Sequence, residues 1–324
     1  MRARALLFVC LLGIASLTFA DDKDADVADK AFAQGRYRDA FDRFKRLSRK
    51  DPACWQCYIG MGRSELGMGD AAKAHSIFDD LLKRSGDKGA RATAHRFKAE
   101  AYLITKDTAH AESELRAAIA EQDSAHLHFL LGLTLMKMER DDEGKAEIQR
   151  FLAAPNVADL VPVARKYLEN PDRARKSYAP DLTFRALDGE EWSLERLKGK
   201  VVVMDFWATW CPPCRASVGE LKELVKRYPQ DRVVLISISG DDDDKAWRDY
   251  VASHKMNWVH YRDSDKSVLK AFGVQGFPTY MIIDGNGVIR KQLSGENPQL
   301  SLAGRIKDIL KDMPELNGAT GSAR

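Results

Sequence analysis

The sequence has few cysteines, little net charge and, beyond residue 20, no long apolar run. Only five cysteines occur in 324 residues, which excludes a small fold held together by disulfides. The 51 basic and 48 acidic side chains leave a formal charge of +3, so we expect no nucleic-acid partner. No later segment approaches the roughly 20 apolar residues of a bilayer-spanning helix. The composition, 44% hydrophobic and 31% charged, is that of a globular protein. The length of 324 residues allows about two domains.

The first twenty residues have the order of a secretory signal peptide. Arg2 and Arg4 precede an apolar run over 5–17, which is followed by small residues and then by acidic ones. We therefore predict a signal peptide over 1–20, cleaved near Ala20, and a soluble protein that is periplasmic or otherwise exported. Cys10 would leave with the signal peptide.

The four remaining cysteines form two Cys-x-x-Cys pairs, Cys54 with Cys57 and Cys211 with Cys214. Disulfides persist outside the cytoplasm, so an even number of cysteines in two close pairs indicates redox chemistry or local cross-links.

The region after the signal contains an internal repeat of 34 residues. Three small or aromatic residues recur at that offset: Gly35, Ala40 and Phe44 return as Gly69, Ala74 and Phe78. This spacing resembles the tetratricopeptide repeat, which implies an α-solenoid of about four helix pairs over 21–158. Lys106 and Glu139 stand where later units would carry the turn glycine. A capping helix and linker are expected over 159–180, and the repeats either bind an unknown protein or only position the attached domain.

Cys54 and Cys57 lie just beyond Pro52, at the predicted start of a helix. One interpretation is a local staple or a pair of free thiols. The other is a second disulfide with redox activity, since a helix N-terminus lowers the pKa of a thiol. The sequence around this pair offers no preceding strand like the one before Cys211.

The second half changes from helical periodicity to strand-like runs. Strands are predicted over 183–187, 201–206, 233–239, 280–284 and 288–293, and helices over 215–228, 244–255 and 299–311. Alternating strands and helices predict an α/β domain over 181–312, followed by a flexible tail over 313–324.

Cys211 and Cys214 lie where a buried strand gives way to a helix. The first sulfur of such a pair lies at the helix N-terminus, where backbone N–H groups stabilise a thiolate. Cys211 is therefore the predicted nucleophile, exposed to substrate, and the more buried Cys214 would resolve the mixed disulfide. Pro212 and Pro213 stiffen the turn, remove two N–H donors and should tune the reduction potential, in a direction the sequence does not fix.

The segment from Asp205 to Cys214, DFWATWCPPC, resembles the active site of thioredoxin, and Phe277-Pro278-Thr279 resembles its second element. The resemblance implies a thioredoxin fold and a cis-proline at Pro278 beside the cysteines. It also implies that Asp205 is a buried general base for Cys214, with Trp210 in the active-site surround.

More narrowly, residues 178–312 resemble the TlpA/ResA group of exported thiol–disulfide oxidoreductases. In that group a membrane thiol carrier usually supplies electrons. Ser217 and Gly219 depart from its pattern, because a glutamate and a proline are common at those positions. This departure puts a specialised role in cytochrome c maturation in doubt, but leaves the disulfide chemistry in place.

The leading hypothesis is an exported thiol–disulfide oxidoreductase that reduces protein or peptide disulfides. No glycine-rich nucleotide fingerprint occurs, so no cofactor is expected. No metal is expected either, because His254 and His260 lie at no spacing that would complete a zinc site with Cys211 and Cys214. One alternative is a protein-binding module whose helical repeats hold a partner and whose thioredoxin-like domain is not catalytic. The other is a thiol peroxidase.

Overall fold

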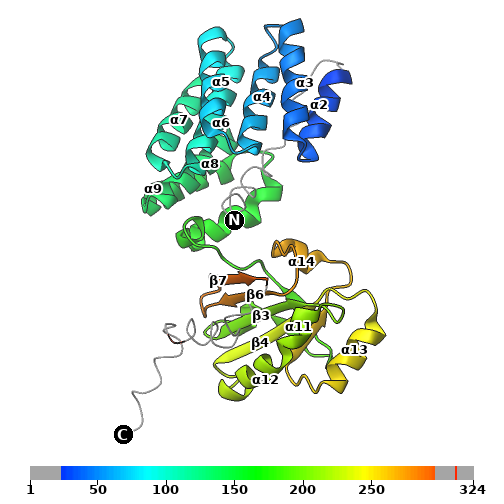
Figure 1. Cartoon of the computed structure of the whole chain (residues 1–324). Coiled ribbons are helices and arrows are strands. Elements are labelled where there is room, and N and C mark those ends of the chain that lie inside the picture. The colour runs from blue at the N-terminus through cyan, green and yellow to red at the C-terminus, as the bar shows by residue number, and fades with distance from the viewer. Residues whose placement is uncertain (1–22, 296–310, 312–324) are drawn as a thin grey trace. The chain divides into compact units, whose positions relative to one another are not determined.

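The computed structural model describes residues 23–295 and residue 311 (Figure 1). It divides into two compact units between Arg175 and Lys176. The predicted signal peptide, the tail over 313–324 and all of the predicted helix over 299–311 except Lys311 lie outside the described residues. None of the described helices has both the length and the apolar character that crossing a bilayer requires.

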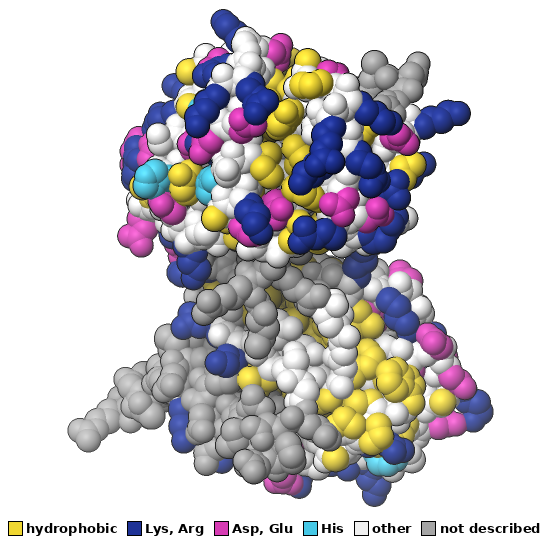
Figure 2. All heavy atoms as spheres, turned by 45° about the horizontal axis from the view of Figure 1, so that its top comes forward, with side chains coloured by type: hydrophobic (Ala, Val, Ile, Leu, Met, Phe, Trp, Pro, Cys, Tyr) yellow, Lys and Arg dark blue, Asp and Glu magenta, His cyan; other side chains and the backbone are white. Residues whose placement is uncertain are grey.

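The first unit is helical, and each of eight successive helices packs against the next one along the chain. Figure 1 shows them as a series of neighbouring helices. They are α2 (Lys23–Ala33), α3 (Tyr37–Lys50), α4 (Trp55–Gly67), α5 (Ala71–Arg84), α6 (Lys88–Ile104), α7 (Thr108–Glu121), α8 (Ala125–Lys137) and α9 (Asp141–Ala153). Two 3-10 turns, η1 (Ala158–Leu160) and η2 (Pro171–Ala174), flank α10 (Val161–Glu169). On the face shown in Figure 2, basic and acidic side chains of this unit are interspersed.

Four equivalent turns mark the internal repeat. Gly35, Gly69, Lys106 and Glu139 all have positive φ, at 74°, 86°, 65° and 63°. At each turn the N–H of the next residue bonds to the carbonyl five positions earlier, as Asp70 does to Glu65. This is the hydrogen bond of a Schellman helix end, which favours glycine but accepts other residues at some cost. The structure thus confirms that Lys106 and Glu139 occupy the turn positions that glycine holds in the first two pairs.

Small residues let the paired helices approach closely. A Cβ atom on Gly62 would lie 2.2 Å from the Phe78 ring, and one on Gly132 would lie 2.9 Å from the carbonyl oxygen of Gly144. These contacts explain why the core of the unit combines glycine and alanine with large aromatic side chains.

The second unit is built on a five-stranded sheet in the order β5-β4-β3-β6-β7. Strand β3 (Val201–Trp207) runs parallel to β4 (Val233–Ser239), and β4 runs parallel to β5 (Val259–Arg262). On the other side of β3, strands β6 (Thr279–Ile283) and β7 (Ile289–Ser294) continue the sheet in antiparallel fashion. A hairpin of β1 (Thr183–Arg185) and β2 (Glu191–Ser193) forms a separate small sheet.

The helices of this unit are α11 (Pro212–Ala216), α12 (Val218–Arg227), α13 (Asp244–Ser253) and α14 (Ser267–Ala271), with a 3-10 turn η3 at Glu195–Leu197. Figure 1 shows β3, β4, β6 and β7 as one layer, with α12 lying against it.

Side-chain alternation along β3 divides the core into two layers. Val202, Met204 and Phe206 pack with residues of the β1–β2 hairpin and of α14. Val201 and Val203 face the opposite way, toward Leu221 and Leu224 of α12. Every residue of β3 is buried, as expected for a central strand covered on both faces.

The structure confirms the predicted strands over 201–206 and 233–239, but it differs from the prediction elsewhere. The predicted helix over 215–228 is two helices that begin earlier, at Pro212, and break at Ser217. The Ser217 hydroxyl donates to the carbonyl of Pro213, a back-bond that bends helices. The sequence analysis also missed β5 and α14, which are only four and five residues long.

Candidate active site

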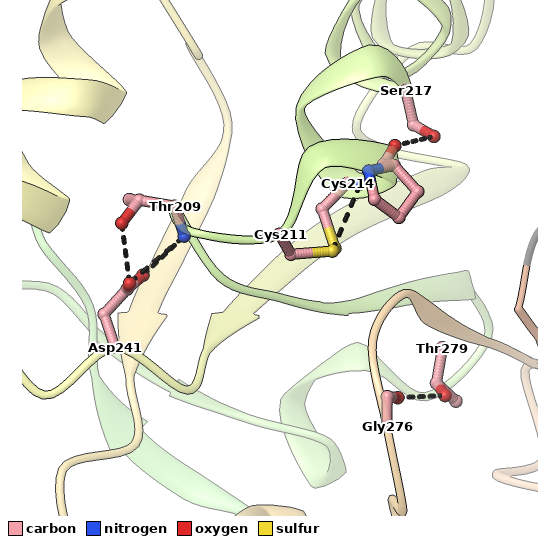
Figure 3. The surroundings of a disulfide bond; sticks show 8 residues. Thr209, Cys211, Cys214, Ser217, Asp241, Gly276 and Thr279 are labelled. Atoms are coloured by element: carbon pink, nitrogen blue, oxygen red, sulfur yellow. Dashed lines mark hydrogen bonds between the residues drawn. A yellow bond between two sulfur atoms is a disulfide. The ribbon is translucent and has the colours of Figure 1, made fainter.

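Strand β3 leads through a short loop into α11 and places the two cysteines at the start of that helix. Cys211 is the N-cap residue, and a disulfide of 2.01 Å joins it to Cys214. The backbone N–H of Cys214 donates to the Cys211 sulfur across 3.3 Å (Figure 3). Pro212 and Pro213 occupy the two helix positions between them and carry no N–H. The N–H of Cys214 is therefore the first one in the helix that the Cys211 sulfur can accept.

Both cysteines are buried in this disulfide form. Cys211 is 4% exposed and Cys214 is 3% exposed. The prediction that Cys211 is exposed and Cys214 is the more buried of the two is therefore wrong for the disulfide form. Apolar side chains of Trp207, Ala208 and Val218 pack around the pair. This shell closes over both sulfurs and leaves the adjacent Trp210, at 65% exposed, as the prominent surface residue.

The Phe277-Pro278-Thr279 segment lies against the same cluster. The peptide bond between Phe277 and Pro278 is cis, the conformation that the thioredoxin resemblance implies. Phe277 packs against the apolar shell of the cysteines, and its ring centre lies 5.7 Å from that of Trp210. The Thr279 hydroxyl donates to the carbonyl of Gly276 across 2.8 Å and closes the turn (Figure 3).

Asp205 lies in the middle of β3 and is 2% exposed. Strand alternation places it on the side of Val201 and Val203, the side that α12 covers. The Ser237 hydroxyl donates to Asp205 Oδ2 across 2.7 Å and accepts a hydrogen bond from the Trp258 indole. Asp205 Oδ1 is buried and has no hydrogen-bond partner among the described residues. Burial raises the pKa of Asp205 to about 7, against a smaller lowering by the Ser237 hydroxyl.

Tyr280 lies directly opposite Asp205 in the β3–β6 register. Burial raises the pKa of Tyr280 above its ordinary value, and the nearby charge of Asp205 raises it further. Tyr280 therefore stays neutral, and Asp205 is the group of this pair that titrates near neutral pH.

Asp241 is a site residue that sequence reasoning missed. It is 2% exposed, and its carboxylate accepts both the backbone N–H and the hydroxyl of Thr209, the latter at 2.7 Å (Figure 3). The Ser239 hydroxyl also donates to it, across 2.6 Å. Asp241 thus fixes the loop two residues before Cys211.

In the sequence, Asp241–Asp244 is a run of four acids ahead of a helix, a pattern that predicts helix capping. That holds for Asp243, which caps α13 by accepting the N–H of Ala246. Only the spacing of Asp241 just after a buried strand could have suggested its different role. The part of the chain that the structure describes contains no group of three or more side chains arranged to hold a metal ion.

Cys54 and Cys57 lie in the first unit and belong to a separate site. A disulfide joins them at the start of α4.

The site has recognisable relatives. The Redoxin family matches residues 174–306. The thiol-disulfide oxidoreductase ResA of Bacillus thuringiensis (strain Al Hakam) is 31% identical over 131 residues, which cover 40% of this chain and 76% of that protein. The ResA protein of Bacillus subtilis (strain 168) is 29% identical over 119 residues, covering 37% of this chain and 66% of that protein.

Solved structures were also found to match part of the chain. The thioredoxin domain of a thiol-disulfide oxidoreductase from Bacteroides vulgatus is 26% identical, with a TM-score of 0.37, and the match covers 41% of this chain and 96% of that one. The second unit is a thioredoxin-fold domain with a Cys-x-x-Cys pair at the start of a helix, and its sequence matches ResA over three quarters of the relative's length. The chain therefore belongs to the ResA family of thiol–disulfide oxidoreductases.

Proposed function

We propose that this protein is an exported reductase of protein or peptide disulfides that works through Cys211 and Cys214. In the reduced enzyme the Cys211 thiolate attacks a substrate disulfide, forms a mixed disulfide and releases one substrate thiolate. Cys214 then loses its proton, attacks the Cys211 sulfur and releases the second substrate thiolate. Two electrons pass to the substrate, and the enzyme is left with the Cys211–Cys214 disulfide.

The hydrogen bond from the Cys214 N–H to the Cys211 sulfur is the observation that carries this assignment. It makes Cys211 the sulfur that the helix N-terminus stabilises as a thiolate. Cys214 lies inside the first turn of the same helix, within disulfide distance, and is therefore the resolving thiol.

The two prolines favour the reducing direction. A thiolate at a helix N-terminus ordinarily finds several free N–H groups, but Pro212 and Pro213 remove two of them. Weaker stabilisation of the thiolate makes the reduced form less stable and the pair a stronger reductant. A strong oxidant requires the opposite, a stabilised reduced form.

Asp205 is the proposed proton acceptor for Cys214. Its pKa of about 7 lets it take a proton near neutral pH, and its Oδ1 has no competing hydrogen bond among the described residues. Trp258, whose indole bonds to Ser237 beside Asp205, also packs against the apolar cluster around the cysteines. Pro278 and its neighbours Phe277 and Thr279 would meet the substrate chain, together with the exposed Trp210.

The first unit is the proposed recruitment domain, with tetratricopeptide repeats over 21–158. Its repeated turns at Gly35, Gly69, Lys106 and Glu139 support that assignment. We propose that the repeats hold a substrate or partner protein, and that a membrane thiol carrier returns electrons to Cys211 and Cys214. The boundaries at 159–180 for the cap and linker, and at 181–312 for the thioredoxin-like domain, belong to the same proposal.

A trapping experiment tests the two cysteine roles. In a background with Cys10, Cys54 and Cys57 changed to Ser, Cys214→Ser should accumulate a mixed disulfide with insulin, because the resolving thiol is gone. Intact-mass analysis without reductant should find one whole insulin molecule per protein, because one attack breaks only one of the two disulfides that join its chains, and dithiothreitol should release it.

The matched variant Cys211→Ser, which keeps Cys214, should form no adduct. It should reduce insulin at least tenfold more slowly than the background protein. Adducts of equal yield in both variants would contradict the assigned order of attack. Insulin reduction by Cys211→Ser that is as fast as reduction by the background protein would leave the repeats as the functional half.

Asp205→Asn should change how the stability of the second unit depends on pH. Because the folded-state pKa is raised, the protonated carboxyl contributes stability that is fully present below about pH 4 and is lost as pH rises through about 7. The shift is worth about 4 kcal/mol at 1.36 kcal/mol per unit. The unfolding free energy of the variant minus that of the wild type should therefore rise by about that amount between pH 4 and pH 8.

Tryptophan fluorescence during urea unfolding measures this difference, because five of the six tryptophans lie in the second unit. Taking the difference cancels the constant cost of the new amide. A difference that is flat with pH would show that Asp205 titrates normally and would remove it as the base.

Asp241→Asn should slow insulin reduction by about tenfold, because a misplaced loop shifts the attacking sulfur. Asp243→Asn is the matched control from the same acidic run, and it should keep most of the activity because Asp243 only caps α13. The pH profile of Cys211 alkylation should shift in Asp241→Asn and not in Asp243→Asn. An unchanged rate and profile in both variants would reduce Asp241 to a structural residue.

A further inference from the structure

The first unit holds a second Cys-x-x-Cys pair whose setting parallels that of the catalytic pair. Cys54 is the N-cap residue of α4, and the N–H of Cys57 donates to its sulfur across 3.3 Å. The same bond has the same length between Cys214 and Cys211. Helix α4 has 13 residues and α11 has five. The helix dipole at the N-terminus of α4 is therefore at least as strong as the one at the N-terminus of α11. The features that favour a thiolate at Cys211 therefore recur at Cys54.

The two sulfurs of this pair differ in access. Cys57 is 1% exposed and belongs to an apolar cluster that includes Phe44, Leu47 and Met61. Cys54 is partly exposed, and the three residues before it, 51–53, are exposed. An incoming thiol can therefore reach Cys54 but not Cys57. This difference in access is the one expected of an attacking and a resolving cysteine, and the catalytic pair, buried at both positions, does not show it in its disulfide form.

The disulfide adds little to the stability of the fold around it. It closes a loop with a sequence separation of only three residues, so its effect on chain entropy is small. The turn before α4 has its own hydrogen bonds, because the N–H of Cys54 donates to the carbonyl of Asp51 and the N–H of Ala53 donates to the Asp51 side chain. The start of the helix can thus keep its conformation when the sulfurs separate.

We propose that Cys54 and Cys57 form a second redox-active site, which exchanges electrons with external dithiols and disulfides. In the oxidised form, one thiolate of a dithiol attacks the Cys54 sulfur, breaks its bond to Cys57 and releases Cys57, which takes up a proton. The second thiol of the reagent attacks the mixed disulfide and releases Cys54 as a thiolate. The dithiol becomes a disulfide, and two electrons enter the first unit; the reverse sequence reduces a disulfide.

The test uses the full chain with Cys10, Cys211 and Cys214 changed to Ser, so Cys54 and Cys57 are the only thiols. The protein is equilibrated in buffers of reduced and oxidised dithiothreitol, quenched in acid and alkylated, and its thiols are counted by mass. As the buffers become more reducing, we expect the count to change from no free thiols to two in a single transition. The circular dichroism of the helices should stay unchanged throughout. A disulfide that survives every buffer in the folded protein would overturn the proposal, as would two free thiols in every buffer.

A second measurement separates a reactive thiolate from a thiol that is merely accessible. In the same background, Cys57→Ser leaves Cys54 alone and Cys54→Ser leaves Cys57 alone. Iodoacetamide should alkylate Cys54 at least tenfold faster than Cys57 at pH 7, and the pH profile for Cys54 should have its midpoint below the ordinary thiol value of about 8.5. Equal rates, or a Cys54 midpoint at or above that value, would contradict the proposal. Because Cys211 and Cys214 are absent, the outcome does not depend on their role.

Discussion

The arrangement of the active site depends on strand β3, which is hydrogen-bonded on both edges and covered on both faces. Its position in the centre of the sheet fixes the point where the chain leaves toward Cys211. It also holds Asp205 away from water, which is why that carboxyl keeps its proton to about pH 7. One buried strand thus supplies both the location of the cysteine pair and the carboxyl that we propose as its proton acceptor.

The parts of the site that the sequence could predict are those with local causes. Cys211 and Cys214 lie one helical turn apart, and a strand of β-branched residues precedes them, so their place at a strand–helix junction follows from spacing alone. The turns at Gly35 and Gly69 follow from the repeat, and Lys106 and Glu139 adopt the same positive φ although neither is a glycine. The cis bond before Pro278 and the importance of Asp205 came from family resemblance, and spacing could not have supplied them.

The parts that the sequence could not predict depend on contacts between distant segments. In the sequence, Asp241 is one member of an acidic run, and only the fold brings it into contact with Thr209, 32 residues earlier. The burial of both cysteines depends on side chains such as Trp207, Val218 and Trp247, which come from different elements. The break at Ser217 results from one side chain bonding to the helix backbone, which periodicity does not register.

The central claim is that Cys211 and Cys214 form a reducing dithiol, and the equilibrium reduction potential of that pair tests it most directly. The protein with Cys10, Cys54 and Cys57 changed to Ser is titrated in dithiothreitol redox buffers and quenched in acid, and its thiols are counted by mass. The account predicts one two-electron transition below about −220 mV. A transition near −120 mV would make the protein an oxidant, and the absence of any titratable pair would contradict the assignment of the active site.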